Sequence, residues 1–318
     1  MIRSVLPSFE RAKLKAVHKA YNGRIASLVR ACLAAWLLVL APAGVRAQRL
    51  LDLPLRISAG ADALAGGAAA AFWNPAGVAR LSTRGEVVIV DVRGPDAIGM
   101  GAFALAAAVR LENGLSLAAG YQHTGTDDIA RTDTSPLPEE SGASFDLAED
   151  AFSLSAAQRL GPVVTVGASA RYTRASAIVD QRNDVGLGAG IEVRPSLPWN
   201  PAAAAAVRAD DGGVTWVAGV EATPAGESGT EWSARVSLGA AGSPFHHDIA
   251  WRGAGSGAWR EHVVISVGVA GEPDAAGTTW QPIMAIAVAL DRYRLGILRE
   301  DLPNGFGAFH SFHFSVAF

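Results

Sequence analysis

Histidine, serine and acidic side chains that could bind a metal or support hydrolysis occur in two places in the sequence. His246, His247 and Asp248 are consecutive, and Ser311 lies two residues before His313. Successive side chains of a strand point to opposite faces, so adjacent histidines cannot hold one ion without a bulge. A serine hydrolase needs a third group that orients its histidine, and no nucleophile signature surrounds Ser311. We therefore expect no metal, no cofactor and no enzyme activity.

Other reactive residue types are confined to the N-terminal end of the chain. Cys32 is the only cysteine, and the lysines are Lys13, Lys15 and Lys19. A downstream lysine nucleophile, thiolate metal site or disulfide is therefore excluded. The acidic stretch 127–146 lacks the spacing of a calcium loop. Nucleic-acid binding needs basic clusters, which the rest of the chain lacks, so we expect no nucleic-acid partner.

The composition describes a folded chain with a distinct N-terminus. Of 318 residues, 50% are hydrophobic and 18% charged, with 35 Gly and one Cys, which excludes disordered, collagen-like and disulfide-rich chains. The first 47 residues carry 8 basic groups and one acid. The remaining 271 residues carry 19 basic and 29 acidic groups, a net charge of -10.

The N-terminal 47 residues have the pattern of a secretory signal. An apolar run over 31–42 follows Arg24 and Arg30 and precedes Val45-Arg46-Ala47, a small-x-small cleavage pattern. The run is shorter than the roughly 20 residues of a membrane-spanning helix. We predict that residues 1–47 are cleaved and that the mature protein begins at Gln48.

Alternation with period two recurs through the rest of the chain and predicts strands. In 164–172, 232–238, 263–269 and 280–290, one face is apolar and the other is small or polar. Many runs reach the roughly 9–11 residues that a tilted strand needs to cross a bilayer. Globular strands average about 5–6 residues. The length of the runs therefore favours membrane strands over a soluble sandwich.

The alternating runs predict fourteen strands, with twelve as the alternative count. They are 85–93, 97–110, 114–124, 147–160, 163–175, 184–194, 201–208, 213–223, 230–240, 245–252, 259–269, 279–290, 292–299 and 307–318. The Ala202 to Ala206 run also fits a helical turn. Tight connections at 112–114, 161–162 and 291–292 are expected on the periplasmic side, and the longest connection, 125–146, on the outside.

The chain ends on a strand whose outward face is apolar. Phe312, Phe314, Val316 and Phe318 share one face, and an aromatic residue is last. This ending resembles the assembly signal of outer-membrane β-barrels. Closed barrels are the β-structures that satisfy every backbone group in lipid. We therefore predict an all-β transmembrane antiparallel barrel in the outer membrane of a Gram-negative-type bacterium, with membrane lipid and the barrel assembly machinery as partners.

Charges within barrel strands are expected to face the lumen. An Arg on the lipid face near the bilayer midplane costs about 2–4 kcal/mol. The candidates are Arg171, Glu192, Arg235, Asp248, Arg260, His262 and Arg294. Two interpretations stay open for them: a structural ladder of ion pairs, or a path for a ligand or an ion.

A short box before the first strand resembles a known signature. Phe72-Trp73-Asn74-Pro75-Ala76-Gly77 is similar to the N-terminal plug signature of the FadL and PorV superfamily of outer-membrane barrels. Segments 149–172 and 292–318 are similar to the PorV branch. The resemblance implies a fourteen-stranded barrel over 85–318 with an inward-folded plug, or hatch, over 48–84. Asn74-Pro75 either forms a turn that aims the chain into the first strand or takes part in gating.

The resemblance implies two kinds of function. PorV-type barrels serve type IX secretion as partners of secretion components, and FadL-type barrels pass hydrophobic molecules. We expect an outer-membrane barrel of the PorV-like type that is accessory to secretion or envelope structure. The alternative is a FadL-type channel for the uptake of small hydrophobic molecules.

Overall fold

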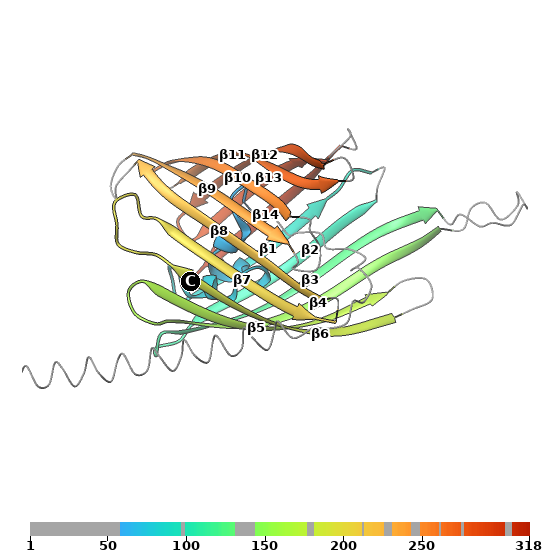
Figure 1. Ribbon diagram of the computed structural model, residues 1–318, viewed down its shortest axis with the longest axis horizontal. Coiled ribbons are helices and arrows are strands. Elements are labelled where there is room, and N and C mark those ends of the chain that lie inside the picture. The colour runs from blue at the N-terminus through green and yellow to red at the C-terminus, as the bar shows by residue number, and fades with distance from the viewer. Residues whose placement is uncertain are drawn as a thin grey trace, which may run out of the picture. The chain divides into compact units, whose positions relative to one another are not determined.

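Fourteen antiparallel strands form a closed barrel in the computed structural model of the chain (Figure 1). The structure describes residues 58–96, 99–130, 144–176, 181–211, 213–225, 231–242, 249–260, 262–274, 277–302 and 307–318. The predicted signal, residues 1–47, and the first part of the predicted plug, residues 48–57, lie outside these ranges.

The elements follow one another around the wall in chain order. Three short 3₁₀ helices come first: η1 (Asp62–Leu64), η2 (Gly67–Phe72) and η3 (Pro75–Arg80). The strands are β1 (Gly85–Arg93), β2 (Met100–Arg110), β3 (Leu115–Ala130), β4 (Ser144–Arg159), β5 (Val164–Ser176), β6 (Gln181–Val193), β7 (Ala202–Asp210), β8 (Gly213–Ala225), β9 (Trp232–Gly242), β10 (Ile249–Trp259), β11 (Val263–Asp274), β12 (Gly277–Leu290), β13 (Tyr293–Asp301) and β14 (Ala308–Ala317).

The wall closes where the first strand pairs with the last. Glu86 of β1 lies opposite Ala317 of β14, and the pairing continues to Arg93 opposite His310. Beyond β14, the amide of Phe318 donates to Gly85 O at 2.9 Å, and Gly85 N donates to Phe318 O at 2.8 Å. The predicted fold class, a closed antiparallel barrel of fourteen strands, is confirmed.

Most predicted strand boundaries lie within a few residues of the observed ones, but the prediction was wrong at the end of β3, which runs to Ala130 rather than 124, and at β10 and β11. The sequence predicted strands over 245–252 and 259–269, whereas the structure has Ile249–Trp259 and Val263–Asp274. Gly253, Gly255 and Gly257 take every outward position between Trp251 and Trp259, so no side chain there produces alternation. The Ala202 to Ala206 run, for which a helical turn was the alternative, belongs to strand β7.

The outer surface of the wall is apolar. Exposed side chains from around the barrel include Leu105, Leu154, Leu187, Leu238, Ile265, Met284, Leu295 and Phe312. Leu154, for example, is 66% exposed. An apolar surface that continues around the barrel is favourable against hydrocarbon and is rare on soluble monomers. In the predicted assembly signal, Phe312 and Phe318 are exposed, while Phe314 and Val316 are half-buried.

The two ends of the barrel differ. The chain end, Phe318, and the tight turns 111–114 and 160–163 lie at one end, called here the turn side. Residues 131–143, which connect β3 to β4, lie at the other end, the loop side. On the turn side, the Trp232 and Trp259 rings are 6.5 Å apart, as in the aromatic girdles that mark a membrane interface.

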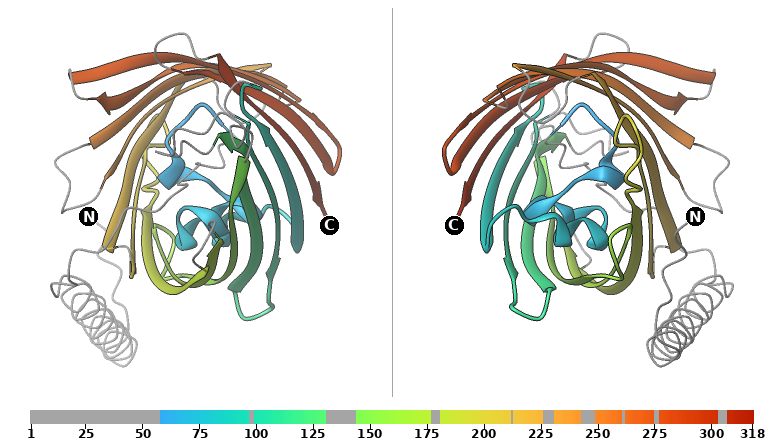
Figure 2. Two further views of the ribbon diagram at one scale, coloured as in Figure 1. Left: turned by 90° about the vertical axis from the view of Figure 1, so that its right-hand side faces the viewer. Right: turned by 90° about the vertical axis from the view of Figure 1, so that its left-hand side faces the viewer.

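Residues 58–84, called here the plug, lie inside the ring of strands (Figure 2). Their small side chains pack closely against inward-facing residues of β1 and β2, with Ala68 and Ala70 fully buried beside Val90 and Ala104. Among the described residues, no helix is long and apolar enough to cross a membrane. The plug is thus a coil of short turns held by the wall around it.

Candidate functional site

Asn74 ties the separate turns of the plug together. Its side chain is fully buried, its Oδ1 accepts from Ala76 N at 3.0 Å, and its Nδ2 donates to Ala63 O at 2.8 Å. The first bond caps η3, where Pro75 occupies the first helical position. The second bond joins η3 to η1. The Asn-Pro pair therefore does more than end the plug, because it fixes two turns relative to each other.

A pair of glycines on the wall forms the seat of the Asn74-Pro75 box. Gly167 of β5 and Gly190 of β6 are direct cross-strand partners. A Cβ on Gly190 would overlap Asn74 Oδ1, and a Cβ on Gly167 would overlap the main chain of Pro75. Glycine at both positions lets the plug backbone approach the wall closely.

A second glycine pair seats the start of the plug. Gly219 of β8 lies opposite Gly239 of β9. A Cβ on either residue would lie 2.7 Å from the Cβ of Ala61. Phe72 uses a third glycine: a Cβ on Gly120 of β3 would lie 2.8 Å from its Cε1. The plug thus contacts wall strands on several sides of the lumen.

The rest of the plug box is packed tightly. Trp73 is half-buried against the alanine-rich core formed by the plug with β1 and β2. Ala76 is fully buried. A Cβ on Gly77 would overlap the carbonyl of Ala65. All six residues of the predicted box, Phe72 to Gly77, therefore lie at contacts that hold the plug in place.

Ion pairs attach the plug to the wall on the turn side. Arg80 Nε lies 3.7 Å from Glu192 Oε1, and Arg80 Nη1 donates to Leu64 O at 2.6 Å. Glu192 is 2% exposed and also pairs with Arg194, which contacts Glu221 at 2.8 Å. Burial, together with repulsion from Arg194, lowers the pKa of Arg80. The carboxylates of Glu192 and Glu221 act in the opposite direction and favour the charged guanidinium.

Two further arginines bind the C-terminal end of the plug, just before the chain enters β1. Arg110 Nη2 donates to Leu81 O and lies 3.4 Å from Ala79 O. Arg159 Nη2 also lies 3.4 Å from Ala79 O. The carbonyls at the C-terminal end of η3 and just after it thereby find donors from β2 and β4, which fixes the direction in which the chain enters β1.

The first group of predicted lumen charges consists of residues that form ion pairs. Arg171 faces inward and pairs with Glu149 at 3.3 Å, and both side chains are largely buried. Glu192 belongs to the plug attachment. Arg235 lies 3.9 Å from Glu221, at the edge of the same network. For these three residues the structure gives ion pairs, the first of the two interpretations left open by the sequence.

Arg294 also faces the lumen and acts on a carboxylate that touches the plug. It exerts a Coulomb interaction on Glu86, and Glu86 Oε2 accepts from Ala68 N at 2.9 Å. A wall carboxylate therefore satisfies a plug amide.

The remaining predicted lumen residues lie elsewhere. Arg260 and His262 occupy the turn after β10, because that strand runs to Trp259 rather than ending at Arg252. Arg260 is exposed, pairs with Glu231 and lies 5.4 Å from the Trp259 ring centroid. Asp248, like His246 and His247, is outside the described residues.

A charged cluster on the loop side was not predicted. Arg252 of β10 is 5% exposed, and its Nη2 lies 2.7 Å from Glu300 Oε2 of β13. Its Nη1 lies 3.6 Å from Asp62 Oδ1 and 3.4 Å from Ser58 O. A local signal for an inward arginine was present in the sequence. The large apolar residues Ile249 and Trp251 alternate with Ala250 and Arg252, which places Arg252 on the inner face. The pairing with Glu300 links residues 48 positions apart, so no local pattern could show it.

The described residues offer no metal centre, and Ser311 and His313 have a packing role. No group of three or more His, Cys, Asp and Glu side chains converges within the described ranges. Ser311 and His313 are 2% and 8% exposed on the inner face of β14. The His313 ring lies against Gly296, its cross-strand partner, where a Cβ would overlap it.

Comparisons with known proteins identify the fold. No protein-family model and no curated protein matches the chain. Among solved structures, the toluene transporter TbuX of Ralstonia pickettii shares 12% identity over 79% of this chain and 94% of its own, with a TM-score of 0.51. The P. putida toluene transporter TodX shares 12% identity over 79% and 94%, with a TM-score of 0.48. The Acinetobacter baumannii outer membrane protein Omp33 shares 11% over 74% and 98%, with a TM-score of 0.45. The likeness to TbuX is one of barrel fold.

Proposed function

We propose that this protein is a plugged outer-membrane channel that admits small apolar molecules. The observation that carries the proposal is the independence of wall and plug. The wall closes through β1 and β14, and residues 58–84 contribute no strand to it. The strand-to-strand ladder of the wall does not depend on the plug, which joins it only at its last residue, where Arg84 O accepts from Arg110 N. The lumen can therefore open by displacement of the preceding plug residues while the barrel remains intact in lipid.

Residence in the outer membrane is supported by the outer surface. Large apolar side chains cover the wall, and aromatic rings gather on the turn side, where Arg292 lies 5.1 Å from the Tyr293 ring centroid. A closed barrel with an apolar outside is suited to a bilayer. Delivery by a cleaved signal peptide remains part of this proposal.

Apolar solutes are supported by two features. Small apolar side chains line the inner wall beside the plug, including Ala202 and Ala204 of β7 with Val217 of β8, which pack against Ala63 of the plug. The structure with the same barrel fold, TbuX, is described as a toluene transporter. The proposal therefore follows the FadL-type alternative of the sequence interpretation.

A second candidate is a PorV-like barrel that is accessory to secretion or envelope structure. The seating of the plug favours it. Two glycine pairs, the bond from Ala68 N to Glu86 and the Arg80 ion pair hold the plug to the wall at several points, as expected of a barrel that does not open. Its partner would be a secretion component rather than a solute.

Planar-bilayer conductance and uptake separate the candidates. The intact protein should show little conductance, and a variant lacking residues 50–80 should show clear open-channel steps. Cells that carry the intact protein should take up labelled toluene faster than cells without it. Equal conductance of the two proteins would contradict a plugging role. Absent uptake, together with a protein partner that co-purifies and crosslinks to the barrel, would favour the accessory function.

Fractionation tests membrane residence. A closed barrel resists detergent until it is boiled, so unboiled and boiled samples should migrate differently on a gel. The protein should fractionate with outer-membrane lipid. Recovery in the soluble periplasm would contradict the proposal.

A further inference from the structure

Three arginines of the described strands face outward, and each lies near the loop-side end of its strand. Arg93 is the last residue of β1, while Arg174 and Arg299 each lie two residues before the end of β5 and β13. An arginine on the lipid face is costly at the bilayer midplane and is tolerated near the interfaces. These side chains therefore mark the level at which hydrocarbon meets the lipid headgroups on the loop side.

The register of the wall places two of these arginines beside one histidine. His310 of β14 is the direct cross-strand partner of Arg93 on one side and of Arg299 on the other. Side chains of direct partners lie side by side on one face, so Arg93, His310 and Arg299 form a row, called here the basic row. Neighbouring strands are about 4.8 Å apart, which puts the backbones of the two arginines about 10 Å apart, with His310 between them.

An aspartate on the same strand holds each arginine of the basic row by one edge. Arg93 Nε donates to Asp91 Oδ2 at 2.9 Å, and Arg299 Nε donates to Asp301 Oδ1 at 2.8 Å. Among the described residues, neither arginine has a hydrogen-bond or ion-pair partner at Nη1 or Nη2. The aspartates thus orient the two guanidinium groups and leave their terminal N–H donors available.

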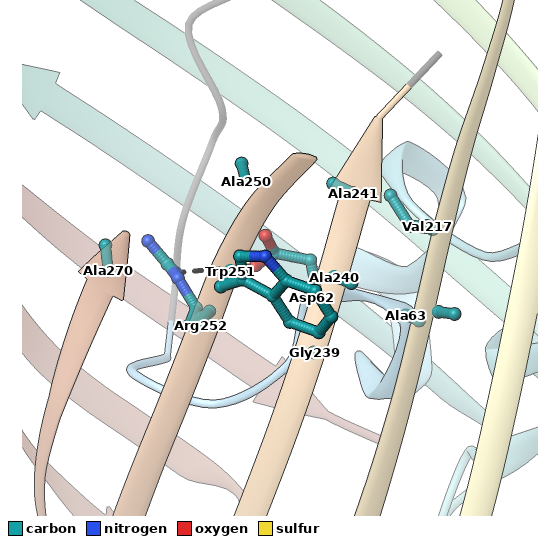
Figure 3. Close-up of a pocket in the computed structure, with 11 residues that line it drawn as sticks. Asp62, Ala63, Val217, Gly239, Ala240, Ala241, Ala250, Trp251, Arg252 and Ala270 are labelled. Carbon is teal, nitrogen blue, oxygen red and sulfur yellow. Dashed lines mark ion pairs between the residues drawn. The ribbon is translucent and has the colours of Figure 1, made fainter. Parts of the chain in front are cut away.

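An inward arginine of the same wall shows the opposite arrangement. Arg252 Nη2 lies 2.7 Å from Glu300, and its Nη1 lies 3.6 Å from Asp62. Figure 3 shows the ion pair between Arg252 and Asp62. Both terminal groups of that guanidinium face protein carboxylates. In the basic row, by contrast, the side chains of Arg93 and Arg299 are 75% and 52% exposed, so their terminal donors face the surroundings of the barrel.

The outer face beside the basic row is apolar toward the membrane centre. Phe312 lies two residues from His310, and Ile297 lies two residues from Arg299, and both side chains are exposed on the same face. Acyl chains that lie along these residues would bring their headgroup to the level of the row. Beyond Arg93, the next cross-strand partner is Gly101 of β2, which has no side chain and leaves room for a headgroup.

We propose that the basic row binds the phosphate group of a lipid in the loop-side leaflet, the leaflet that we predict to be the outer one. Guanidinium groups bind phosphate through directed, charge-assisted hydrogen bonds. The Nη groups of the two arginines and a ring N–H of His310 supply donors from three strands, and a phosphate offers three acceptor oxygens. The two aspartates balance the charge of the two arginines, so recognition depends on these short-range bonds.

A lipid bound there would brace the seam at which the barrel closes. Arg93 belongs to the first strand, and Arg299 lies on the far side of the last strand, β14. One phosphate that contacts both arginines links β1 to β13 across β14 from the lipid side. A ligand that binds only the folded state stabilises it, so the lipid should raise the temperature at which the barrel unfolds. This effect does not depend on what the lumen carries.

Diphosphoryl lipid A and the same lipid with its phosphates removed test the proposal. Each is titrated into the purified, detergent-solubilised protein, and native mass spectrometry measures the bound fraction. The phosphorylated lipid should bind at least about tenfold more tightly, because it alone makes the charge-assisted bonds. The double variant Arg93→Gln, Arg299→Gln should bind the two lipids equally.

His310→Glu is a second variant that keeps the barrel folded. The new carboxylate would lie between Arg93 and Arg299 and pair with both, so it excludes phosphate without leaving the arginines unpaired. This variant should also lose the preference for phosphorylated lipid. Loss of the unboiled gel form on heating should move to higher temperature with lipid A in the unmodified protein, and should not move in His310→Glu.

The matched control is Arg174→Gln. Arg174 faces outward at the same distance from the end of its strand as Arg299, but it lies outside the basic row and its Nη2 donates to Gln181 Oε1 at 3.1 Å. This variant should bind lipid A and gain heat resistance like the unmodified protein.

Three outcomes would overturn the inference. The first is equal binding of the two lipids by the unmodified protein, and the second is an equal loss of lipid A binding in Arg174→Gln and the double variant. The third is displacement of lipid A by inorganic phosphate at the same concentration, which would assign the row to free phosphate. Bilayer conductance and toluene uptake are separate measurements, so the channel function stands or falls independently of these results.

Discussion

Gly167 and Gly190 are cross-strand partners on the inner wall, and the Asn74-Pro75 box lies against the surface that the pair leaves bare. Two side chains are missing at adjacent points of neighbouring strands, so the plug backbone contacts the wall backbone directly. The same arrangement recurs at Gly219 and Gly239. Paired glycines therefore let the plug backbone pack directly against the wall, without a pocket formed by side chains.

Gly190→Ala should unseat the plug. The new Cβ would overlap Asn74 Oδ1, which already accepts a bond from Ala76 N. Overpacking of this kind costs about 1–3 kcal/mol. The seated plug should lose that stability, which corresponds to roughly 5–150-fold more unseated plug. Planar-bilayer recordings should show more frequent open-channel steps.

Gly255→Ala is the matched control. Gly255 is also a strand glycine, but it faces outward with nothing within 4 Å of a new Cβ. The conductance of the Gly255→Ala variant should equal that of the unmodified protein. A closed Gly190→Ala channel, or an equally leaky Gly255→Ala channel, would contradict the seating role of the glycine pair.

Asn74→Ala should weaken the plug more than Asn74→Asp does. Alanine removes both the acceptor for Ala76 N and the donor to Ala63 O in a fully buried site. A buried polar group left unpaired costs about 1–3 kcal/mol. Aspartate keeps the cap but loses the donor. Protease digestion in detergent should cut the plug faster in the order Ala, then Asp, then Asn. An unchanged digestion rate for Asn74→Ala would argue against this role.

Glu192→Gln should raise channel opening through loss of a buried charge. Arg80 and Arg194 would then face each other without the carboxylate that both contact. The arginines are partly exposed, so we expect the seated plug to lose about 1–3 kcal/mol of stability, which is less than the full cost of breaking a buried ion pair. Glu112→Gln serves as control, since its pair with Arg84 is fully at the surface and worth about 0–1 kcal/mol. Conductance that rises equally in both variants would contradict the attachment.

Deleting Phe318 should lower the amount of folded barrel in the membrane. Phe318 closes the wall through two backbone bonds with Gly85, and its ring covers Gly85 on the outer face. Phe152→Ala, which removes an exposed outer aromatic away from the closure, should assemble at near the normal level. Heat-modifiable protein in outer-membrane fractions measures both. Undiminished assembly of the deletion would count against a C-terminal assembly signal.

The mature protein should begin at Gln48. The predicted signal, residues 1–47, would be removed after Ala47 during export, and Cys32 would leave with it. Intact-mass measurement of the purified barrel should give the mass of residues 48–318 and show no reaction with a thiol reagent. A mass that includes any earlier residue would place the cleavage elsewhere.

The sequence by itself determined the barrel, most of its strands and the plug box. Side-chain alternation in a strand has a period of two residues. The sequence of a strand therefore indicates which face meets lipid, provided that both faces carry side chains. That is why β1 was predicted with its observed bounds, Gly85–Arg93. It is also why β10 was misplaced, because its outward glycines leave one face without a signal.

Only the tertiary structure decided what holds the plug. Gly167 meets Gly190 through the register of β5 and β6, Arg252 of β10 meets Glu300 of β13 across two intervening strands, and Asn74 of the plug meets a bare patch of wall. Arg260 shows the same limit, since a shift of the strand end moved it from the expected lumen to the rim. Periodicity is a local property of the chain, whereas register and closure depend on which strands pair around the whole ring, and the plug contacts follow from that pairing.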